Sequence, residues 1–166
     1  MKMKKKLKDP KEQKMRRVVW FLLLIAIFVF AIDHFFKNIC KTGTNFLFIY
    51  IKRGLNTGAA FSLLSNVSWA RILLIIVGIL VLILIAILYL KNHKNKLLKV
   101  AFAFIFAGTI SNTLDRLFLG YVVDCFTLTF WKTFPAFNIA DLINLTGVIL
   151  VLIFLFKKKN DKRRNN

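Results

Sequence analysis

The sequence contains one long apolar stretch that decides its fold, WARILLIIVGILVLILIAILYL at residues 69–90. Beyond its first turn, Gly78 is the only interruption in this stretch, and Lys91 follows the stretch directly. A helix of about 20 apolar residues is long enough to cross the hydrocarbon core of a bilayer. This stretch therefore predicts a membrane-spanning helix.

Three further apolar runs extend this pattern along the 166-residue chain, at about residues 18–38, 100–119 and 138–156. The chain is 58% hydrophobic, whereas a soluble domain would be nearer half apolar. We therefore predict an all-α membrane protein with four transmembrane helices. One four-span domain at 18–156 is expected between basic tails at 1–17 and 157–166. The first run resembles a signal peptide, but no small-x-small cleavage site follows it, which predicts an uncleaved span.

The basic residues lie beside the apolar runs. The formal net charge of +19 would suit a nucleic-acid partner, but 19 of the 26 Lys and Arg residues lie in 1–17, 91–99 and 157–164. Cytoplasmic loops of membrane proteins carry such an excess of positive charge. We therefore expect both termini in the cytoplasm, two loops outside, contact with membrane lipid, and no nucleic-acid partner.

The two outer segments span residues 40–68 and 120–137, and the alternation at Asn45–Lys52 predicts short strands in the first. Cys40 and Cys125 map to the outer half without the spacing of a metal site. They could form a disulfide in an oxidising compartment, but we expect two free, partly buried thiols. His34 and His93 are isolated, so neither a metal nor a cofactor is expected.

Four of the seven acidic residues lie outside the tails: Asp33, Asp115, Asp124 and Asp141. Counting about 1.5 Å of rise per residue from the basic flanks places Asp33, Asp115 and Asp141 in one layer of the outer leaflet. Asp124 follows the third span and can fold back toward that layer. Carboxylates at this depth are costly unless they are paired or functional.

The pairing of these acids separates two of them from the others. Asp33 has Lys37 four residues on, which is a favourable order on a helix. Asp115 is expected to reach Asn112 or the backbone of an outer segment, because adjacent helical residues such as Arg116 point away. Asp124 and Asp141 have no basic residue within four positions. They form the remaining pair.

Two carboxyl groups held close together in a site of low dielectric share one proton. Such a pair can activate water and polarise a carbonyl, as aspartic proteases do, without a metal. A metalloprotease His-Glu-x-x-His run is absent from the sequence. Position alone leaves two other interpretations open: an acidic layer that lines a cation pore or transporter, and structural roles such as Asp141 capping the fourth helix.

Four segments together carry a specific resemblance. They are Asp33-His-Phe-Phe-Lys37, Asn56-Thr-Gly-Ala-Ala-Phe-Ser-Leu-Leu64, Asn112-Thr-Leu-Asp-Arg116 with Gly120-Tyr-Val-Val-Asp124, and Asn138-Ile-Ala-Asp141. In order and spacing, the chain resembles the bacterial lipoprotein signal peptidase family, also called signal peptidase II. The family acts on diacylglyceryl-modified prolipoproteins and cuts on the N-terminal side of the lipidated cysteine.

The resemblance implies an aspartic endopeptidase with the catalytic pair Asp124 and Asp141. It implies a monomer in the bacterial cytoplasmic (inner) membrane, with the active site near the outer face and a small β-cradle over it, formed by the first outer segment. The implied substrate-binding or site-shaping residues are Asn56, Asn112, Arg116 and Asn138. The implied supporting residues are Asp33, Lys37, Gly58, Gly108 and Asp115.

The chain departs from the family pattern at a few positions. Ser111 stands where the family usually has glycine, and Phe35 and Phe36 replace residues that are often small or polar. Cys125 replaces the aromatic residue that usually follows the first catalytic aspartate, which suggests thiol-sensitive activity. The resemblance does not explain the long basic N-terminal extension.

Overall fold

The structure is a computed structural model that describes residues 10–40, 43–59, 63–65, 67, 69–131 and 133–164. Residues 60–62 of the second motif lie outside this part. The helices are α1 (Pro10–Ile39), α2 (Ala70–Asn92), α3 (Lys96–Phe118) and α4 (Ile139–Arg164). The strands are β1 (Thr44–Phe46), β2 (Ile49–Asn56) and β3 (Val122–Leu128).

All four helices are long and apolar enough to cross a membrane, which confirms a multi-pass membrane protein with the predicted four spans. α3 is the central helix and packs against the other three. Half of its most apolar window is buried, against 22% in α1 and 11% in α2 and α4. The polar residues that α3 carries are therefore directed into the protein, and the other helices present most of their apolar surface outward.

Small residues bring α4 close to α3. A Cβ atom at Gly108 would lie 2.7 Å from the Asn144 side chain, and one at Gly147 would lie 2.7 Å from the Ala101 carbonyl oxygen. Glycine at these positions allows two helix backbones to approach each other. This contact places the start of α4 beside the outer half of α3, where the predicted site residues lie.

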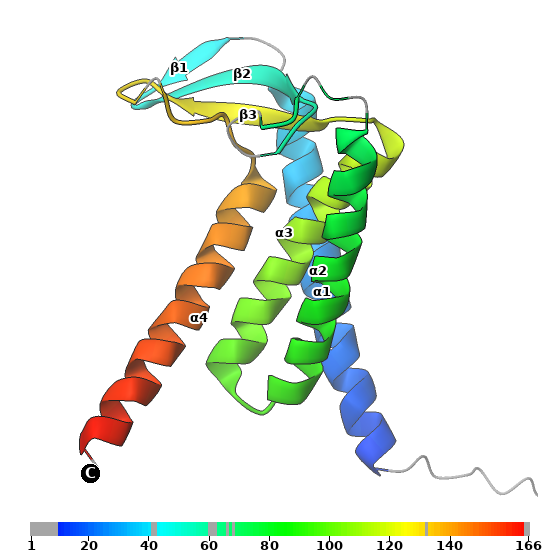
Figure 1. Cartoon of the computed structure of the whole chain (residues 1–166), viewed down its shortest axis with the longest axis vertical. Helices are drawn as coiled ribbons and strands as arrows, with labels where there is room; N and C mark the ends of the chain where they lie inside the picture. Colours follow the sequence, from blue (N-terminus) through cyan, green and yellow to red (C-terminus); the bar gives the residue numbers. More distant parts are fainter. Residues whose placement is uncertain are drawn as a thin grey trace, which may run out of the picture.

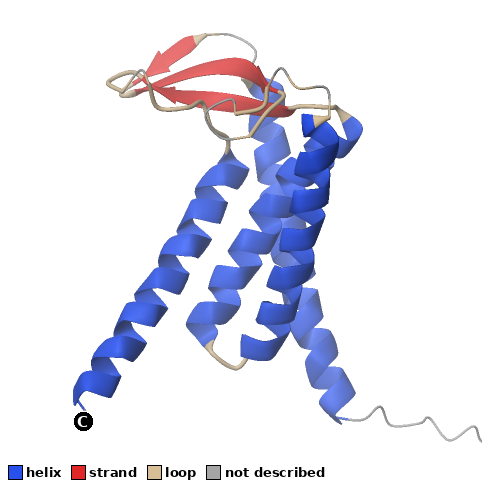
Figure 2. Ribbon diagram, viewed as in Figure 1, coloured by secondary structure: helices blue, strands red, loops and turns tan. Residues whose placement is uncertain are grey.

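A three-stranded antiparallel sheet in the order β1-β2-β3 covers one end of the helices. The start of α1 and the end of α4 lie at the opposite end (Figures 1 and 2). The first outer segment forms β1 and β2 of the expected cradle, and the second outer segment adds β3. The pairing of β3 with β2 joins segments far apart in sequence and has no local signature.

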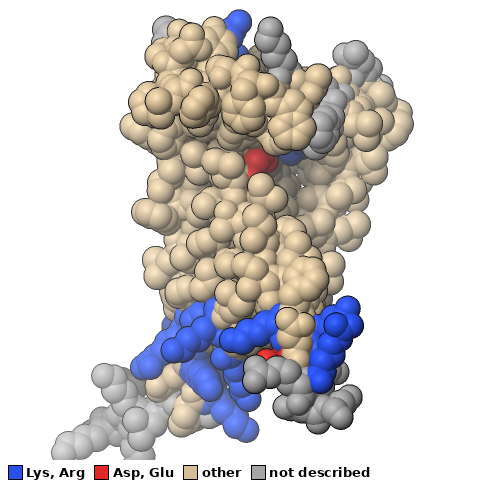
Figure 3. All heavy atoms as spheres, turned by 90° about the vertical axis from the view of Figure 1, so that its left-hand side faces the viewer, with Lys and Arg blue, Asp and Glu red and all other residues tan. Residues whose placement is uncertain are grey.

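Two helices extend beyond the predicted spans. α1 begins at Pro10, so residues 10–17 of the predicted basic tail are helical. α4 continues through the basic residues to Arg164. Lys, Arg, Gln and Glu are good helix formers, and proline is favoured at a first helical position. Basic side chains gather at the end opposite the sheet, as Figure 3 shows.

A disulfide joins Cys40, just after α1, to Cys125 in β3, with the two Cα atoms 5.7 Å apart. The expectation of two free thiols is therefore wrong. Both cysteines are buried beneath the sheet in an apolar cluster with Val123 and Phe126. The sequence allowed a disulfide but did not favour it, because the two cysteines come together only when β3 crosses the end of α1.

Candidate active site

Asp124 lies in the middle of β3 and is buried, with 3% of its surface exposed. The sheet register pairs it with Gly54, so that Asn56, two residues further along β2, lies on the same face. Asn56 Nδ2 donates to Asp124 Oδ2 at 3.1 Å, and Asn138 Nδ2 donates to Asp124 Oδ1 at 2.8 Å. Both carboxyl oxygens thus accept a hydrogen bond from an amide.

Asp141 lies in the first turn of α4, where it forms a reciprocal cap with Asn138. The Asp141 backbone N–H donates to Asn138 Oδ1 at 2.9 Å, and the Asn138 backbone N–H donates to Asp141 Oδ2 at 3.1 Å. This arrangement satisfies two N–H groups at the helix start, as in a capping box. The capping role that position alone left open is therefore present, in addition to any role in chemistry.

Asn138 brings the two predicted catalytic aspartates together. Its side chain donates to Asp124 and its backbone donates to Asp141, so both carboxyl groups lie within reach of one residue. Asp124 is buried, whereas Asp141 is half-buried and remains accessible. Figure 3 shows an acidic side chain at the molecular surface just below the sheet.

The surroundings make Asp124 hard to ionise. Burial raises its pKa from 3.8 to about 6, and the nearby charge of Asp141 acts in the same direction. The hydrogen bonds from Asn56 and Asn138 and the charge of Lys37 oppose this shift. A carboxyl group with such a pKa can hold a proton close to neutral pH, as a shared-proton pair requires.

The predicted site-shaping amides contact the aspartates directly. Asn112 Nδ2 donates to Asp141 Oδ1 at 2.8 Å, in addition to the contacts of Asn56 and Asn138 described above. The Asn56 amide is itself held by the Gly58 N–H, which donates to Asn56 Oδ1 at 3.0 Å. Gly58 is required in this tight turn, because a Cβ atom there would lie 2.9 Å from the backbone nitrogen of Ser65.

Arg116 connects α3 to the loop after β2. Its Nη2 donates to the Gly58 carbonyl oxygen at 2.9 Å and its Nη1 to the Asn112 carbonyl oxygen at 3.3 Å. In the part of the chain that the structure describes, Arg116 Nε is buried without a hydrogen-bond partner. The guanidinium lies in the electrostatic field of Asp141 and Asp124.

The supporting residues form a buried ion-pair cluster around Lys37, which contacts both Asp33 and Asp115. The Lys37–Asp115 contact is 2.8 Å. Asp115 was expected to bond Asn112 or the backbone of an outer segment, but it reaches across to α1 for its ion pair. The expectation missed this contact because it considered only neighbours in sequence.

Asp33 also helps to hold the start of α4. Its Oδ1 accepts from the Ala140 backbone N–H at 3.0 Å, and its Oδ2 accepts from Ser111 Oγ at 2.7 Å. Ser111, which departs from the family pattern, thus gains a buried partner. Asp33 therefore connects α1 to the turn that carries Asp141.

Sequence reasoning missed Arg71, which lies in the first turn of α2. Its Nε donates to the Arg116 carbonyl oxygen and its Nη2 to the Leu117 carbonyl oxygen, both at 3.0 Å. A cation that bonds the last carbonyl groups of α3 stabilises that helix end. An arginine within an otherwise apolar span was the available signal.

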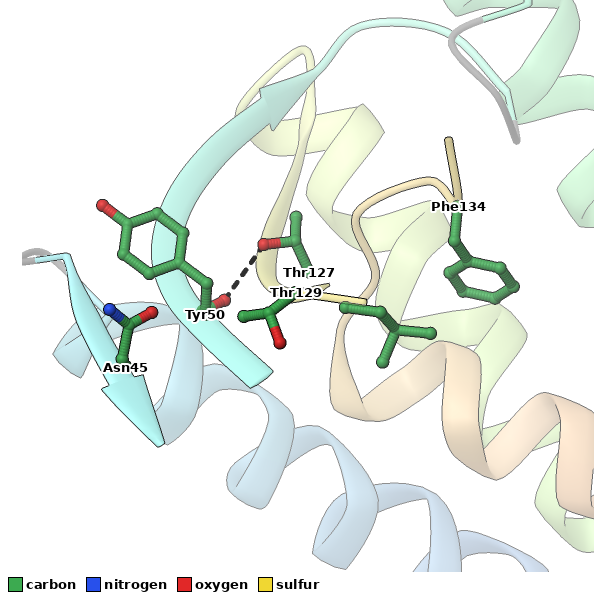
Figure 4. Close-up of a pocket in the computed structure, with 6 residues that line it drawn as sticks. Asn45, Tyr50, Thr127, Thr129 and Phe134 are labelled. Atoms are coloured by element: carbon green, nitrogen blue, oxygen red, sulfur yellow. Dashed lines mark hydrogen bonds between the residues drawn. The ribbon is translucent and has the colours of Figure 1, made fainter. Parts of the chain in front are cut away.

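A separate hollow of about 390 Å³ lies on the sheet (Figure 4). Its lining residues are Asn45, Tyr50, Thr127, Leu128, Thr129 and Phe134. None of these is a predicted site residue. Among the described residues, no group of three or more His, Cys, Asp or Glu side chains is placed to hold a metal ion.

Comparisons with known proteins agree on one family. The family model described as signal peptidase (SPase) II matches residues 25–157. The lipoprotein signal peptidase of Staphylococcus haemolyticus strain JCSC1435 is 35% identical over 150 residues, which cover 84% of this chain and 93% of that protein. The lipoprotein signal peptidase of Staphylococcus aureus strain JH9 is 36% identical over 151 residues, which cover 85% of this chain and 91% of that protein.

The fold is also similar to solved structures. A bacterial membrane enzyme structure obtained by the in meso method at 2.3 Å has a TM-score of 0.76 and 32% identity, covering 87% of this chain and 92% of that one. A second such structure, at 1.9 Å, has a TM-score of 0.75 and 32% identity, covering 84% of this chain and 94% of that one. At these identities and coverages, the similarity to the two solved structures extends to the amino-acid sequence as well as to the fold.

Proposed function

Because this chain belongs to the signal peptidase II family, a family of peptidases that remove signal peptides from prolipoproteins, we propose that Asp124 and Asp141 are its catalytic pair. The single observation that supports this pair best is Asn138, which donates one hydrogen bond to each carboxylate. The chain would then be an aspartic endopeptidase that acts without a metal or cofactor.

In the proposed reaction the pair holds one proton. Asp141, more accessible and at the positive end of a helix, is the carboxylate that takes a proton from the attacking water. Asp124, whose raised pKa suits it to hold a proton, donates a hydrogen bond to the scissile carbonyl oxygen. The hydroxyl adds to the carbonyl carbon, and the tetrahedral intermediate collapses as the peptide C–N bond breaks. The leaving nitrogen takes a proton from the pair and becomes the new N-terminus.

The proposed substrate is a prolipoprotein that carries a diacylglyceryl group on the cysteine after the scissile bond. Asp124 lies in β3 and Asp141 in the first turn of α4, which begins just below the sheet. A lipid-modified cysteine would reach this place from the bilayer. Asn56, Asn112, Arg116 and Asn138 would shape this site. Asp33, Lys37, Gly58, Gly108 and Asp115 would support it.

The distribution of charge supports a proposed orientation in the bacterial cytoplasmic membrane. The basic residues at 10–17, 91–99 and 157–164 belong to the end opposite the sheet, and positive residues favour the cytoplasmic side. The sheet and the carboxylate pair would then lie near the outer face. The four-span peptidase unit of residues 18–156 would act as a monomer between two basic cytoplasmic segments.

The decisive experiment compares three single variants with the native protein. Asp124→Asn and Asp141→Asn remove one carboxylate each, and Asp161→Asn removes an exposed acid at the far end of α4 as a matched control. Purified proteins are incubated with a diacylglyceryl-modified precursor and with the unlipidated precursor. We expect the native protein and Asp161→Asn to cleave only the lipidated precursor, and the other two to be inactive. Retained cleavage by Asp124→Asn or Asp141→Asn would refute the proposed pair.

A further inference from the structure

Asn112 stands between the buried Lys37 cluster and Asp141. Its Nδ2 donates to Asp141 Oδ1 at 2.8 Å, while its Oδ1 accepts from Lys37 Nζ at 3.2 Å. The side chain is 8% exposed, so water has little access to it. The two ends of this amide thus connect a buried cation on α1 to an acid on α4.

The chemistry of Lys37 fixes which way this amide points. An ammonium group only donates hydrogen bonds, so the Asn112 atom that faces it must be the oxygen. The nitrogen then faces Asp141, which receives a donor that favours its ionised form. If the amide were reversed, its oxygen would face the carboxylate and would favour a protonated Asp141 instead.

Lys37 has the right number of hydrogens to hold the Asn112 amide in this orientation. Its ammonium has three hydrogens and contacts three acceptors in the structure, on Asp33, Asp115 and Asn112. The two acids neutralise the buried charge and hold the group in place. The third hydrogen is therefore directed at Asn112 Oδ1.

Asn138 is a weaker alternative for holding this orientation. Its Nδ2 has two hydrogens but lies near three acceptors: Asp124 Oδ1 at 2.8 Å, Asn112 Oδ1 at 3.2 Å and the Val123 carbonyl oxygen at 3.4 Å. The contact with the acid is the shortest of the three, so one of the two hydrogens is directed at Asp124. Asn112 therefore depends on Lys37 for its principal donor.

We propose that Lys37 is a positioning residue for the reaction, because it orients the Asn112 amide so that Asp141 receives a hydrogen-bond donor and serves as the base. This inference rests on the proposed function. It gives the buried cluster a role in the chemistry and not only in the architecture. The charged groups that face the pair are Asp33 and Lys37 from α1 and Asp115 and Arg116 from α3.

The test removes the ammonium together with one of its two acids, and Asp33 keeps its hydrogen bonds from Ser111 and Ala140. The double variant Lys37→Met/Asp115→Leu deletes one cation and one acid, so the net charge of the cluster is unchanged. Replacing a buried ion pair with apolar residues of similar volume is often neutral for stability. Neither new side chain can donate to Asn112. Lys91→Met, at an exposed lysine near the end of α2, is the matched control.

We expect the folded double variant to keep its KM and to lose about tenfold in kcat, the effect of one lost hydrogen bond to a charged pair. The acidic limb of its kcat–pH profile should move up by about one pH unit, because Asp141 has lost a donor. Lys91→Met should match the native protein in each measurement. A folded double variant with native kcat and a native pH profile would overturn the proposal.

A second variant covers the case in which the double variant does not fold. Lys37→Arg keeps the charge, but a planar guanidinium cannot direct three hydrogens at these three acceptors. We expect the same loss of kcat and the same shift of the acidic limb, whereas native values for both would reject the role of Lys37. If the native protein cleaves the precursor and Asp141→Asn does not, these outcomes bear on Lys37 alone and leave the proposed function intact.

Discussion

Replacing Asn138 should separate the stability of α4 from the chemistry of the aspartates, because this residue serves both through different atoms. Its Oδ1 caps the helix by accepting from the Asp141 N–H, and its Nδ2 donates to Asp124 at 2.8 Å. In Asn138→Ala both contacts are lost. Asn138→Ser keeps a cap acceptor but cannot place an amide N–H on Asp124.

The structure sets the size of each effect. Loss of a cap side chain costs about 1 kcal/mol of stability. A buried hydrogen bond to a neutral group, such as the protonated Asp124, contributes about 0.5–1.5 kcal/mol, and if it acts in the transition state its loss lowers kcat by about 2- to 10-fold. Asn138→Ala should therefore show both losses. Asn138→Ser should recover most of the stability and little of the kcat.

The assay combines urea or thermal unfolding in detergent with initial rates on a lipidated precursor, measured on the same preparations. Recovery of native kcat in Asn138→Ser would refute the claim that the amide donor on Asp124 matters for catalysis. Native stability in Asn138→Ala would refute the claim that Asn138 caps α4. The two results are independent, so either can fail alone.

Two further predictions concern the pKa of Asp124 and the disulfide. Because burial raises the pKa of Asp124 from 3.8 to about 6, its folded form holds a proton that the unfolded form releases, so stability should fall by about 3 kcal/mol as the pH rises from 4 to 7. Unfolding of Asp124→Asn should depend less steeply on pH across this window, and equal slopes would contradict the shift. Reduction of the disulfide, which spans 85 residues, should lower the free energy of unfolding by up to about 4.5 kcal/mol and slow cleavage, because Cys125 adjoins Asp124. The variant Cys40→Ser/Cys125→Ser should not respond to dithiothreitol, and a response equal to that of the native protein would assign the effect to something else.

The sequence was sufficient for the number and position of the four spans because that property is nearly local. A span depends on about 20 apolar residues in succession, and the basic flanks mark where each one ends. The same counting placed Asp33, Asp115 and Asp141 at one depth. It did not predict that residues 10–17 are helical, because hydropathy reports where the chain leaves the membrane and not where a helix begins.

The sequence by itself also selected Asp124 and Asp141, since an acid without a nearby base in sequence stands out in an apolar chain. Asp33 and Lys37 pair as the sequence predicted, but only the tertiary structure decided how the other acids are partnered. Asp115 reaches Lys37 on another helix, β3 pairs with β2, and Cys40 meets Cys125, all across long separations in sequence. Such contacts form where segments far apart in sequence pack together, so the sequence of one segment cannot predict them. The contacts of Asn138 with the two carboxylates also depend on the tertiary structure, because they exist only where α4, α3 and β3 meet.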